Sequence, residues 1–115
     1  MRDDSERLLD ILSAINRVLA KTGTGSAPFQ ADEMLQVWAI HHLQIIGEAC
    51  RCLSQEFRLR HRDEVWGKAT GLRHLLVHHY FEIDAALVWN VIEQDLPALK
   101  EKVTTILEAF PPPAS

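Results

Sequence analysis

The apolar residues of this chain recur with the period of an α-helix along almost its whole length. No segment shows the alternation of apolar and polar residues that marks a half-buried strand. The chain has 115 residues, of which 47% are hydrophobic, enough for one packed core. We therefore predict an all-α fold, with a single domain over residues 1–115 and four helices in an up-down bundle.

Polar stretches rich in Gly, Ser and Pro separate the predicted helices. Asp3 or Asp4 can cap the first helix, and Asp84 can cap the last. Pro97 lies inside the last helix and should kink or briefly interrupt it, because proline lacks an N–H. The Pro-rich end, 111–115, is expected to be disordered. The predicted helices are Asp4–Lys21, Asp32–Phe57, Val65–Tyr80 and Ala85–Glu108, with polar connections over Thr22–Pro28 and Arg58–Glu64.

Charge and cysteine usage narrow the class of protein. The formal net charge of −4 argues against a general nucleic-acid coat protein but allows a local phosphate site. The first residues are too polar for a signal peptide, and no apolar run could span a bilayer, so we expect a cytoplasmic protein without a membrane partner. Cys50 and Cys52 would point to opposite sides of a helix, so we expect two reduced thiols.

The second predicted helix has a wider apolar arc than one core contact requires. Its apolar residues cover about half the circumference, against about 100° for an ordinary surface helix. This width predicts two contacts, one with the core and one with a partner subunit. His42 falls in the arc and is expected to be structural, whereas His41 is left open. The arc contains Met34, Leu35, Trp38, Ile45, Ile46, Ala49 and Leu53.

The stretch "GLRHLLVHHY", Gly71–Tyr80, mixes leucines with five titratable side chains. Projection onto a helix separates the two kinds of residue. His74 and His78 flank the polar side, and His79 falls among the leucines. The core face holds Val65, Ala69, Leu72, Leu75 and Leu76, and the opposite side holds Trp66, Thr70, Arg73, Val77 and Tyr80.

Each polar residue of this helix has a structural and a functional interpretation. Arg73 is either a solvated or salt-bridged surface residue or a phosphate ligand. His74 and His78 have the spacing of a two-histidine metal site, but no H-E-x-x-H pattern supplies a third ligand. His79 suits a hydrogen-bonded core position, and Tyr80 can simply end the helix. Arginine and histidine on one face could instead cleave RNA without metal, through attack of the 2′-hydroxyl on the adjacent phosphate.

Several motifs together resemble a known family. The residues from Arg73 to Tyr80 read as R-x4-H-x-Y, which resembles the signature of the HEPN superfamily in its HepT-like toxin branch. "LQIIGEACRCLS" (Leu43–Ser54) is similar to the I-G-E-A helix of that family. "VWGKATGLRHLLVHHYFEIDAALVWNVIEQDLPALK" (Val65–Lys100) follows its W…R…H-x-Y…D-L-P-x-L pattern. The resemblance covers the last two-thirds of the chain.

This resemblance implies a four-helix HEPN fold and a homodimer whose two motifs meet in a cleft. It implies a metal-independent ribonuclease toxin, without a cofactor, that acts on RNA. Its partner would be a minimal nucleotidyltransferase antitoxin of the MntA type, which transfers AMP to the motif tyrosine. Arg73 and His78 would then be catalytic and Tyr80 the adenylylation site. An added AMP would occupy the phosphate site beside Arg73 and repel RNA.

Further residues are candidates for supporting roles. His74 stands where this branch usually has Asn or Asp, so its role is open. Glu48 matches the Glu of I-G-E-A and either pairs with a motif arginine or histidine or packs at a helix crossing. Gly47 indicates a close helix–helix contact. In the predicted polar connection, Arg58, Arg60 and Arg62 either contact the RNA backbone or form a solvated loop.

The sequence also allows two rival hypotheses. One is a catalytically silent helical module that binds the nucleotidyltransferase and serves as its substrate, which the acidic net charge favours. The other is a metal-dependent hydrolase that uses His74 and His78.

Overall fold

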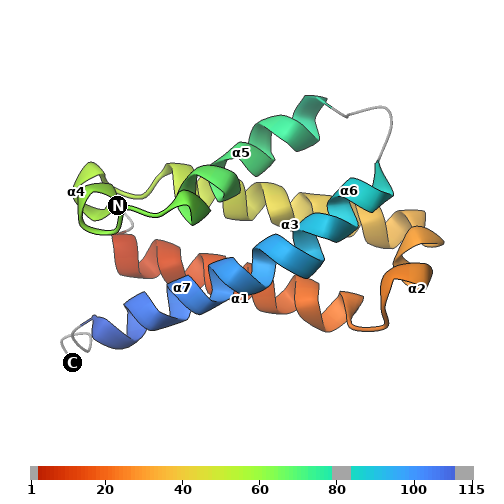
Figure 1. The fold of residues 1–115 in the computed structure, drawn as a ribbon, viewed down its shortest axis with the longest axis horizontal. Coiled ribbons are helices and arrows are strands. Elements are labelled where there is room, and N and C mark those ends of the chain that lie inside the picture. The colour runs from red at the N-terminus through yellow and green to blue at the C-terminus, as the bar shows by residue number, and fades with distance from the viewer. Residues whose placement is uncertain (1–2, 79–83, 111–115) are drawn as a thin grey trace.

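The computed structural model describes residues 3–78 and 84–110. This part of the chain is helical and contains no strand, which confirms the predicted all-α class (Figure 1). The 111–115 tail lies outside the described residues. The elements are α1 (Asp4–Thr22), α2 (Ser26–Gln30), α3 (Glu33–Arg51), α4 (Gln55–Arg60), α5 (Glu64–His78), α6 (Ala85–Asn90), the π-helical segment η1 (Val91–Asp95) and α7 (Leu96–Ala109).

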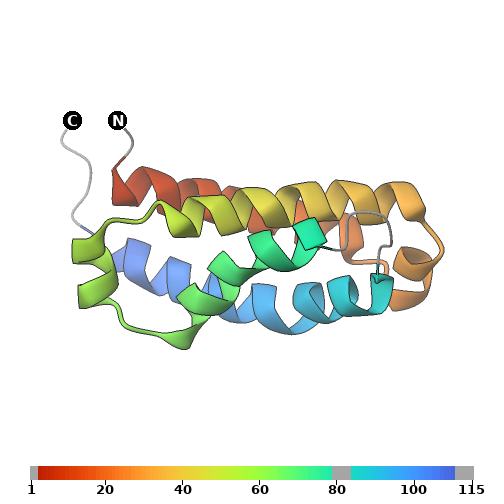
Figure 2. The same ribbon diagram turned by 90° about the horizontal axis from the view of Figure 1, so that it is seen from above.

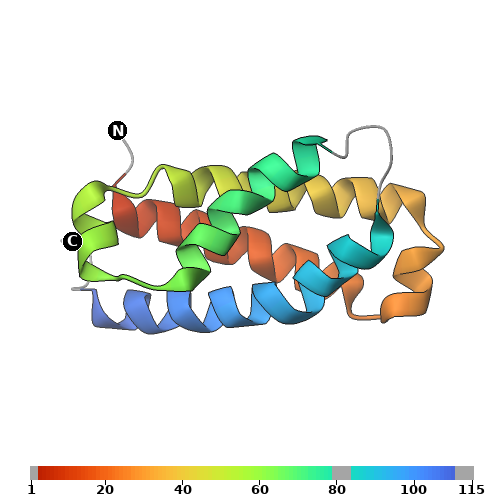
Figure 3. The same cartoon turned by 45° about the horizontal axis from the view of Figure 1, so that its top comes forward.

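The long helices run up and down the length of the molecule. α1 and α3 lie side by side in opposite directions, α5 crosses obliquely, and α6, η1 and α7 form the fourth column (Figures 2 and 3). The short helices α2 and α4 lie at opposite ends of the bundle, where the chain reverses direction (Figure 1). Four columns in up-down order are the arrangement predicted from the helical period.

Side-chain caps set where several helices begin. The backbone N–H of Glu6 donates to the Asp3 carboxylate at 2.9 Å, and that of Leu35 donates to Asp32 at 3.0 Å. Asp84 caps α6 in the same way, by accepting from the N–H of Leu87. Each cap satisfies a backbone donor that the first helical turn leaves without a partner. The caps at Asp3 and Asp84 were predicted.

The second predicted helix, Asp32–Phe57, is wrong beyond Arg51. The chain leaves α3 and starts α4 with Ser54 as its cap, whose Oγ accepts from the N–H of Phe57 at 3.0 Å. The Asp4 carboxylate accepts two hydrogen bonds from Ser54, through its N–H at 2.9 Å and its hydroxyl at 2.6 Å. A contact spanning 50 residues therefore holds this turn, and helical periodicity alone does not contain it.

Each of the two predicted polar connections contains part of a short helix. Arg58 and Arg60 lie on α4, so the predicted loop Arg58–Glu64 is reduced to its second half. The predicted loop Thr22–Pro28 overlaps α2, which inserts the fully buried Phe29 into the core. In both places an aromatic residue is buried by a helical turn at the end of the bundle.

The predicted interruption near Pro97 is confirmed as a π-helical segment. In η1 the N–H of Leu96 donates to the carbonyl oxygen of Val91, five residues earlier. Pro97 then falls in the first turn of α7, where its missing N–H needs no partner. The wider turn directs Val91 and Ile92 into the core.

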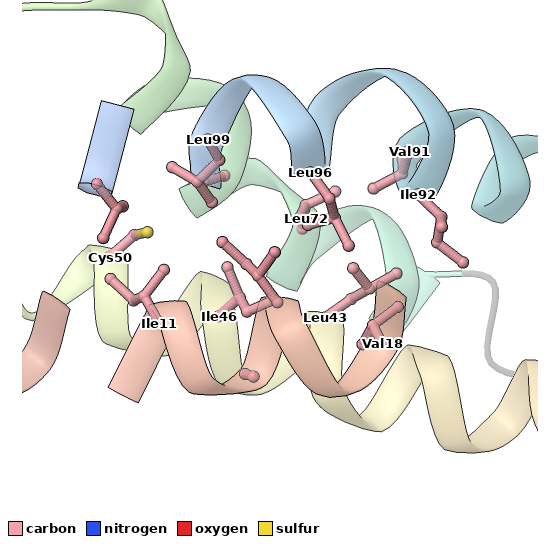
Figure 4. Close-up of a cluster of buried hydrophobic side chains, with 14 of the residues drawn as sticks. Ile11, Val18, Leu43, Ile46, Cys50, Leu72, Val91, Ile92, Leu96 and Leu99 are labelled. Atoms are coloured by element: carbon pink, nitrogen blue, oxygen red, sulfur yellow. The ribbon is translucent and has the colours of Figure 1, made fainter. Parts of the chain in front are cut away.

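The core fills the space between the four columns, with side chains from α1, α3, α5, η1 and α7 pointing toward one another (Figure 4). Within the described ranges, every helix is too short or too polar to cross a bilayer. The largest fully buried side chains are Phe29, Leu8, Ile11, Ile15, Leu43, Ile46, Leu96, Leu99, Val18, Val103 and Cys50.

Candidate functional site

The crossing of α3 and α5 is built on a glycine. A Cβ at Gly47 would lie 3.1 Å from the carbonyl oxygen of Ala69 and 3.2 Å from the backbone nitrogen of Arg73. These distances are shorter than ordinary van der Waals contacts, so a side chain here would force the backbone of α5 to give way, and the predicted close contact at Gly47 is confirmed. The backbone of Arg73 is thereby held directly against α3.

Glu48, the next residue on α3, pairs with Arg73 across this crossing. Its Oε2 lies 3.3 Å from Nε of Arg73. The same carboxylate accepts from Nη2 and Nε of Arg51, at 2.6 and 3.2 Å. The hydrogen bond from Arg51 lowers the pKa of Glu48, and the charges of Arg51 and Arg73 lower it further. One carboxylate thus orients two guanidinium groups.

This arrangement combines both interpretations of Glu48, since the residue lies at a helix crossing and pairs with the motif arginine. All three side chains are about half exposed, so water screens the ion pairs and they contribute little to stability. Arg73 approaches the carboxylate through its Nε. The pair therefore holds the guanidinium group at the surface, where its charge suits binding of a phosphate.

His78, the second residue of the motif, ends α5. It lies about 7.5 Å further along the helix axis than Arg73, at 1.5 Å per residue. The side chains of residues 74–78 and all of residues 79–83 lie outside the described part of the chain. The predicted roles of His74, His78, His79 and Tyr80 therefore stay predictions. In the described ranges, no group of three or more His, Cys, Asp and Glu side chains is placed to hold a metal ion.

The three arginines predicted as RNA-backbone contacts have different surroundings. Arg58 donates through Nη2 to the carbonyl oxygens of Cys50 and Arg51, so it satisfies the C-terminal end of α3. Arg60 pairs with Glu56 at 2.7 Å on the exposed side of α4. Arg62 lies in the connection between α4 and α5, beside a pocket.

That pocket, here called the α4–α5 pocket, has a volume of about 560 Å³. Trp66 was predicted on the side opposite the core, and this is wrong, because only 8% of its surface is exposed. Its ring packs edge-on against Phe57 of α4, with centroids 5.3 Å apart. The helix break at Cys52 brings α4 over this side of α5. The lining residues are Cys50, Leu53, Arg58, His61, Arg62, Asp63, Trp66, Gly67, Thr70 and Gly71.

The wide apolar arc of α3 is partly exposed, as the prediction of a second contact requires. Met34, Val37 and Ile45 remain large exposed apolar residues on this helix. His41 is also exposed, whereas His42 is buried with its Nδ1 3.0 Å from the carbonyl oxygen of Trp38, which confirms its structural role. The apolar surface therefore runs along α3 toward Glu48.

The fold and the site together define the class of protein. It is an up-down helical bundle whose third column, α5, carries an arginine paired with a carboxylate of α3. The sequence model of one protein family, described as "Ribonuclease HepT-like", matches residues 10–106. The chain therefore belongs to the HepT-like ribonuclease family. No solved structure matches it significantly.

Several relatives carry names that place them among ribonucleases. The RNase-named protein MJ1380 of Methanocaldococcus jannaschii is 35% identical over 106 residues, covering 91% of this chain and 97% of that protein. A protein of Caldanaerobacter subterraneus subsp. tengcongensis, also named for RNase activity, is 34% identical over 86 residues, covering 75% of this chain and 77% of its own. A Thermococcus cleftensis protein named as a ribonuclease HepT is 34% identical over 74 residues, 64% of this chain and 67% of that protein.

Proposed function

We propose that this chain is a metal-independent endoribonuclease and the toxin of a HepT/MntA-type toxin–antitoxin pair. The observation that carries the proposal is Arg73, held by Glu48 at the α3–α5 crossing, on the helix that brings His78 five residues later. Membership of the HepT-like ribonuclease family supports RNA as the substrate. The M. jannaschii and T. cleftensis relatives are named as ribonucleases, which supports the same point.

In the proposed mechanism Arg73 binds the scissile phosphate and offsets the charge that develops on its oxygens. The 2′-oxygen forms a bond to phosphorus and the bond to the 5′-oxygen breaks. The 2′-hydroxyl loses its proton and the leaving oxygen gains one. His78 is the group that handles a proton, because imidazole titrates near neutral pH. Glu48 acts as a positioning residue that orients Arg73.

A homodimer is part of the proposal. Arg73 and His78 lie well apart around one helix, so a cleft between two chains brings such groups together more easily than one chain does. The exposed Met34, Val37 and Ile45 on α3 support a second subunit contact beside Glu48. Val37→Glu with Ile45→Glu should yield a monomer in analytical ultracentrifugation, and an unchanged dimer would contradict this interface.

Neutralisation is proposed to occur at Tyr80, two residues after His78. A nucleotidyltransferase antitoxin of the MntA type would transfer AMP from ATP to the tyrosine oxygen and release pyrophosphate. The added phosphate carries negative charge next to the RNA site and so opposes RNA binding. Intact mass after incubation with that partner and ATP should rise by AMP units. Tyr80→Phe should lose the gain, and a gain that persists would place the modification elsewhere.

Substitution of the motif tests the nuclease itself. Arg73→Ala and His78→Ala should each abolish RNA cleavage and growth arrest while thermal unfolding stays cooperative. Arg73→Lys should keep partial activity, because lysine retains the charge but loses the planar fork. Full cleavage by both alanine variants would contradict the proposal.

The net charge of −4 favours a second candidate, a catalytically silent module that the nucleotidyltransferase modifies. A wild-type protein that acquires AMP yet leaves RNA intact would establish that second function.

A further inference from the structure

We infer that the α4–α5 pocket binds a nucleotide of the RNA strand through its phosphate, at a subsite separate from Arg73. The inference rests on the proposed ribonuclease function and extends it, since it says where the strand runs beyond the reacting phosphate. Three independent features of the pocket support it: a buried donor, an excess of cationic side chains, and an uncovered stretch of helix backbone.

The buried donor is the indole N–H of Trp66. The side chain lines the pocket and is 8% exposed, and its Nε1 has no hydrogen-bond partner among the described residues. A buried donor without an acceptor is costly, so such groups in native proteins usually meet a ligand or water. An indole N–H can only donate, so an occupant of the pocket that meets it must offer an acceptor oxygen.

The charges around the pocket favour an anionic occupant. Arg58, His61 and Arg62 line it, and Asp63 is the one carboxylate among the described lining residues. Asp63 already accepts from the N–H of Val65 at 3.0 Å and pairs with Lys102 at 3.2 Å. Its charge is therefore offset, and the arginines dominate the local field.

Part of the pocket wall is helix backbone, at Gly67 and Gly71. A Cβ added at Gly67 or Gly71 would meet nothing within 4 Å, so the surface of α5 is open at both positions, on either side of Thr70. Glycine allows a ligand to approach backbone closely. On an α-helix, positions 67, 71, 74 and 78 recur on one face. A ligand lying over Gly71 is thus about 10 Å along the axis from position 78.

The size of the pocket argues for a nucleotide of a strand rather than a free phosphate ion. About 560 Å³ is within the range of sites for organic ligands. His61, which lines it, packs at a tilt against the buried Phe57 with ring centroids 4.6 Å apart, and aromatic rings of this kind can stack on bases. The face of α5 that carries Gly67 and Gly71 continues along the helix to position 78.

Trp66→Phe tests the donor with little change in shape. Binding is measured by fluorescence anisotropy with a 2′-O-methyl oligoribonucleotide, which cannot be cleaved by its own 2′-hydroxyl. We expect about tenfold weaker binding, as for a lost hydrogen bond to a charged group, with an equal or higher melting temperature because a buried unsatisfied donor is removed. Unchanged affinity would overturn the role of Trp66.

A pair of charge variants tests the site independently of the buried tryptophan. Arg62→Gln and Lys100→Gln each remove one exposed positive charge, the first beside the pocket and the second on α7, outside it. Arg62→Gln should weaken RNA binding and reduce the salt dependence by about 0.7 in slope, the value for one phosphate contact on a single strand. Equal losses in both variants would overturn the site, since they would reflect net charge alone.

Competition separates the possible sources of the phosphate. Inorganic phosphate and AMP, each at millimolar concentration and constant ionic strength, should displace the strand poorly. Displacement by inorganic phosphate as efficient as by unlabelled RNA would overturn the assignment to a strand. The proposed function fails separately, if Arg73→Ala still cleaves RNA. The subsite alone fails if Trp66→Phe and Arg62→Gln bind like wild type while Arg73→Ala is inactive.

Discussion

Gly47 on α3 and the pair Gly67 and Gly71 on α5 show two opposite uses of glycine within one helix pair. A side chain at Gly47 would press against the backbone of α5, at 3.1 Å from the oxygen of Ala69, whereas one at Gly67 or Gly71 would enter open space. At the crossing, glycine allows close packing that holds Arg73. On the other side, glycine leaves helix backbone accessible. One side of α5 is fixed by its neighbour, and the other is free to meet a ligand.

Gly47→Ala should produce the largest effect on the fold. The neighbouring atoms belong to backbone and cannot move aside without shifting a helix, so overpacking should cost about 1–3 kcal/mol of unfolding free energy. Cleavage should fall as well, because Arg73 moves away from Glu48. Urea unfolding and an RNA cleavage assay measure the two effects. Gly67→Ala is the matched control, and equal stability of the two variants would contradict the tight crossing.

Glu48→Gln should reduce activity without an equivalent loss of stability. The substitution keeps the shape but removes the charge that orients Arg73, so we expect about a tenfold fall in kcat with a smaller change in KM, in the range of a lost positioning contact. Glu48→Asp, which keeps the negative charge, should retain part of the kcat that Glu48→Gln loses. Glu56→Gln, which breaks the exposed pair with Arg60, is the control and should leave cleavage unchanged. An equal effect of both glutamine variants would remove the special role of Glu48.

The pH dependence of the Glu48 pair follows from its lowered pKa. The hydrogen bond from Arg51 is the main cause, and the charge of Arg73 adds to it. A carboxylate with a depressed pKa in the fold stabilises the protein above its ordinary pKa of 4.5 and loses this contribution as the pH falls through the lowered value. The ion pair should therefore be intact at pH 6, and stability differences between wild type and Glu48→Gln should shrink only in stronger acid.

What could be predicted from the sequence depends on whether a feature is local or is formed by contacts far apart in the chain. Helical period, the caps at Asp3 and Asp84 and the interruption before Pro97 are local properties, and all were predicted correctly. Gly47 and His42 were also identified, since both lie within one strongly patterned helix. The end of α3 was missed because the Asp4–Ser54 hydrogen bonds that hold the turn span 50 residues.

The error at the end of α3 produced the errors around the α4–α5 pocket. A projection of one helix assumes a single core direction, but α4 folds back and gives α5 a second buried side at Trp66. Arg51 was missed because its role depends on sharing Glu48 with Arg73, a contact between two helices. The sequence contains the motif residues of the site, whereas the third partner and the pocket follow from tertiary packing.

Gly71→Ala should stabilise the fold while weakening RNA binding. Alanine in an open helical position typically adds about 0.5–1 kcal/mol over glycine, and the added methyl group would lie where the strand is proposed to approach α5. Thermal unfolding measures the expected gain in stability, and fluorescence anisotropy measures the expected loss of RNA affinity. Gly25→Ala is an instructive control, because that position also has open space but a φ of 103°, so alanine there should destabilise. A stabilised Gly71→Ala variant with unchanged RNA affinity would contradict close approach of the strand.

The reactivity of the two cysteines should distinguish a buried position of α3 from a half-buried one, without any substitution. Cys50 lines the α4–α5 pocket from a fully buried position, and burial raises the pKa of its thiol to about 12, whereas Cys52 is half-buried beside Glu48. Iodoacetamide at pH 8 should therefore modify Cys52 and spare Cys50, as peptide mass mapping can measure. Because the thiol is held neutral in the fold, Cys50 favours folding below its ordinary pKa of 9.0, and this contribution is lost as the pH rises from 9.0 toward 12.

The thiols also distinguish the two kinds of glycine. Gly47→Ala should speed alkylation of Cys50, because loosening the α3–α5 crossing exposes the side of α3 that carries this residue. Gly71→Ala adds a methyl group in open space and should leave the rate unchanged. Equal rates in the two variants would mean that the shielding of Cys50 does not depend on the α3–α5 crossing. The crossing at Gly47 would then hold Arg73 without contributing to closure of the pocket.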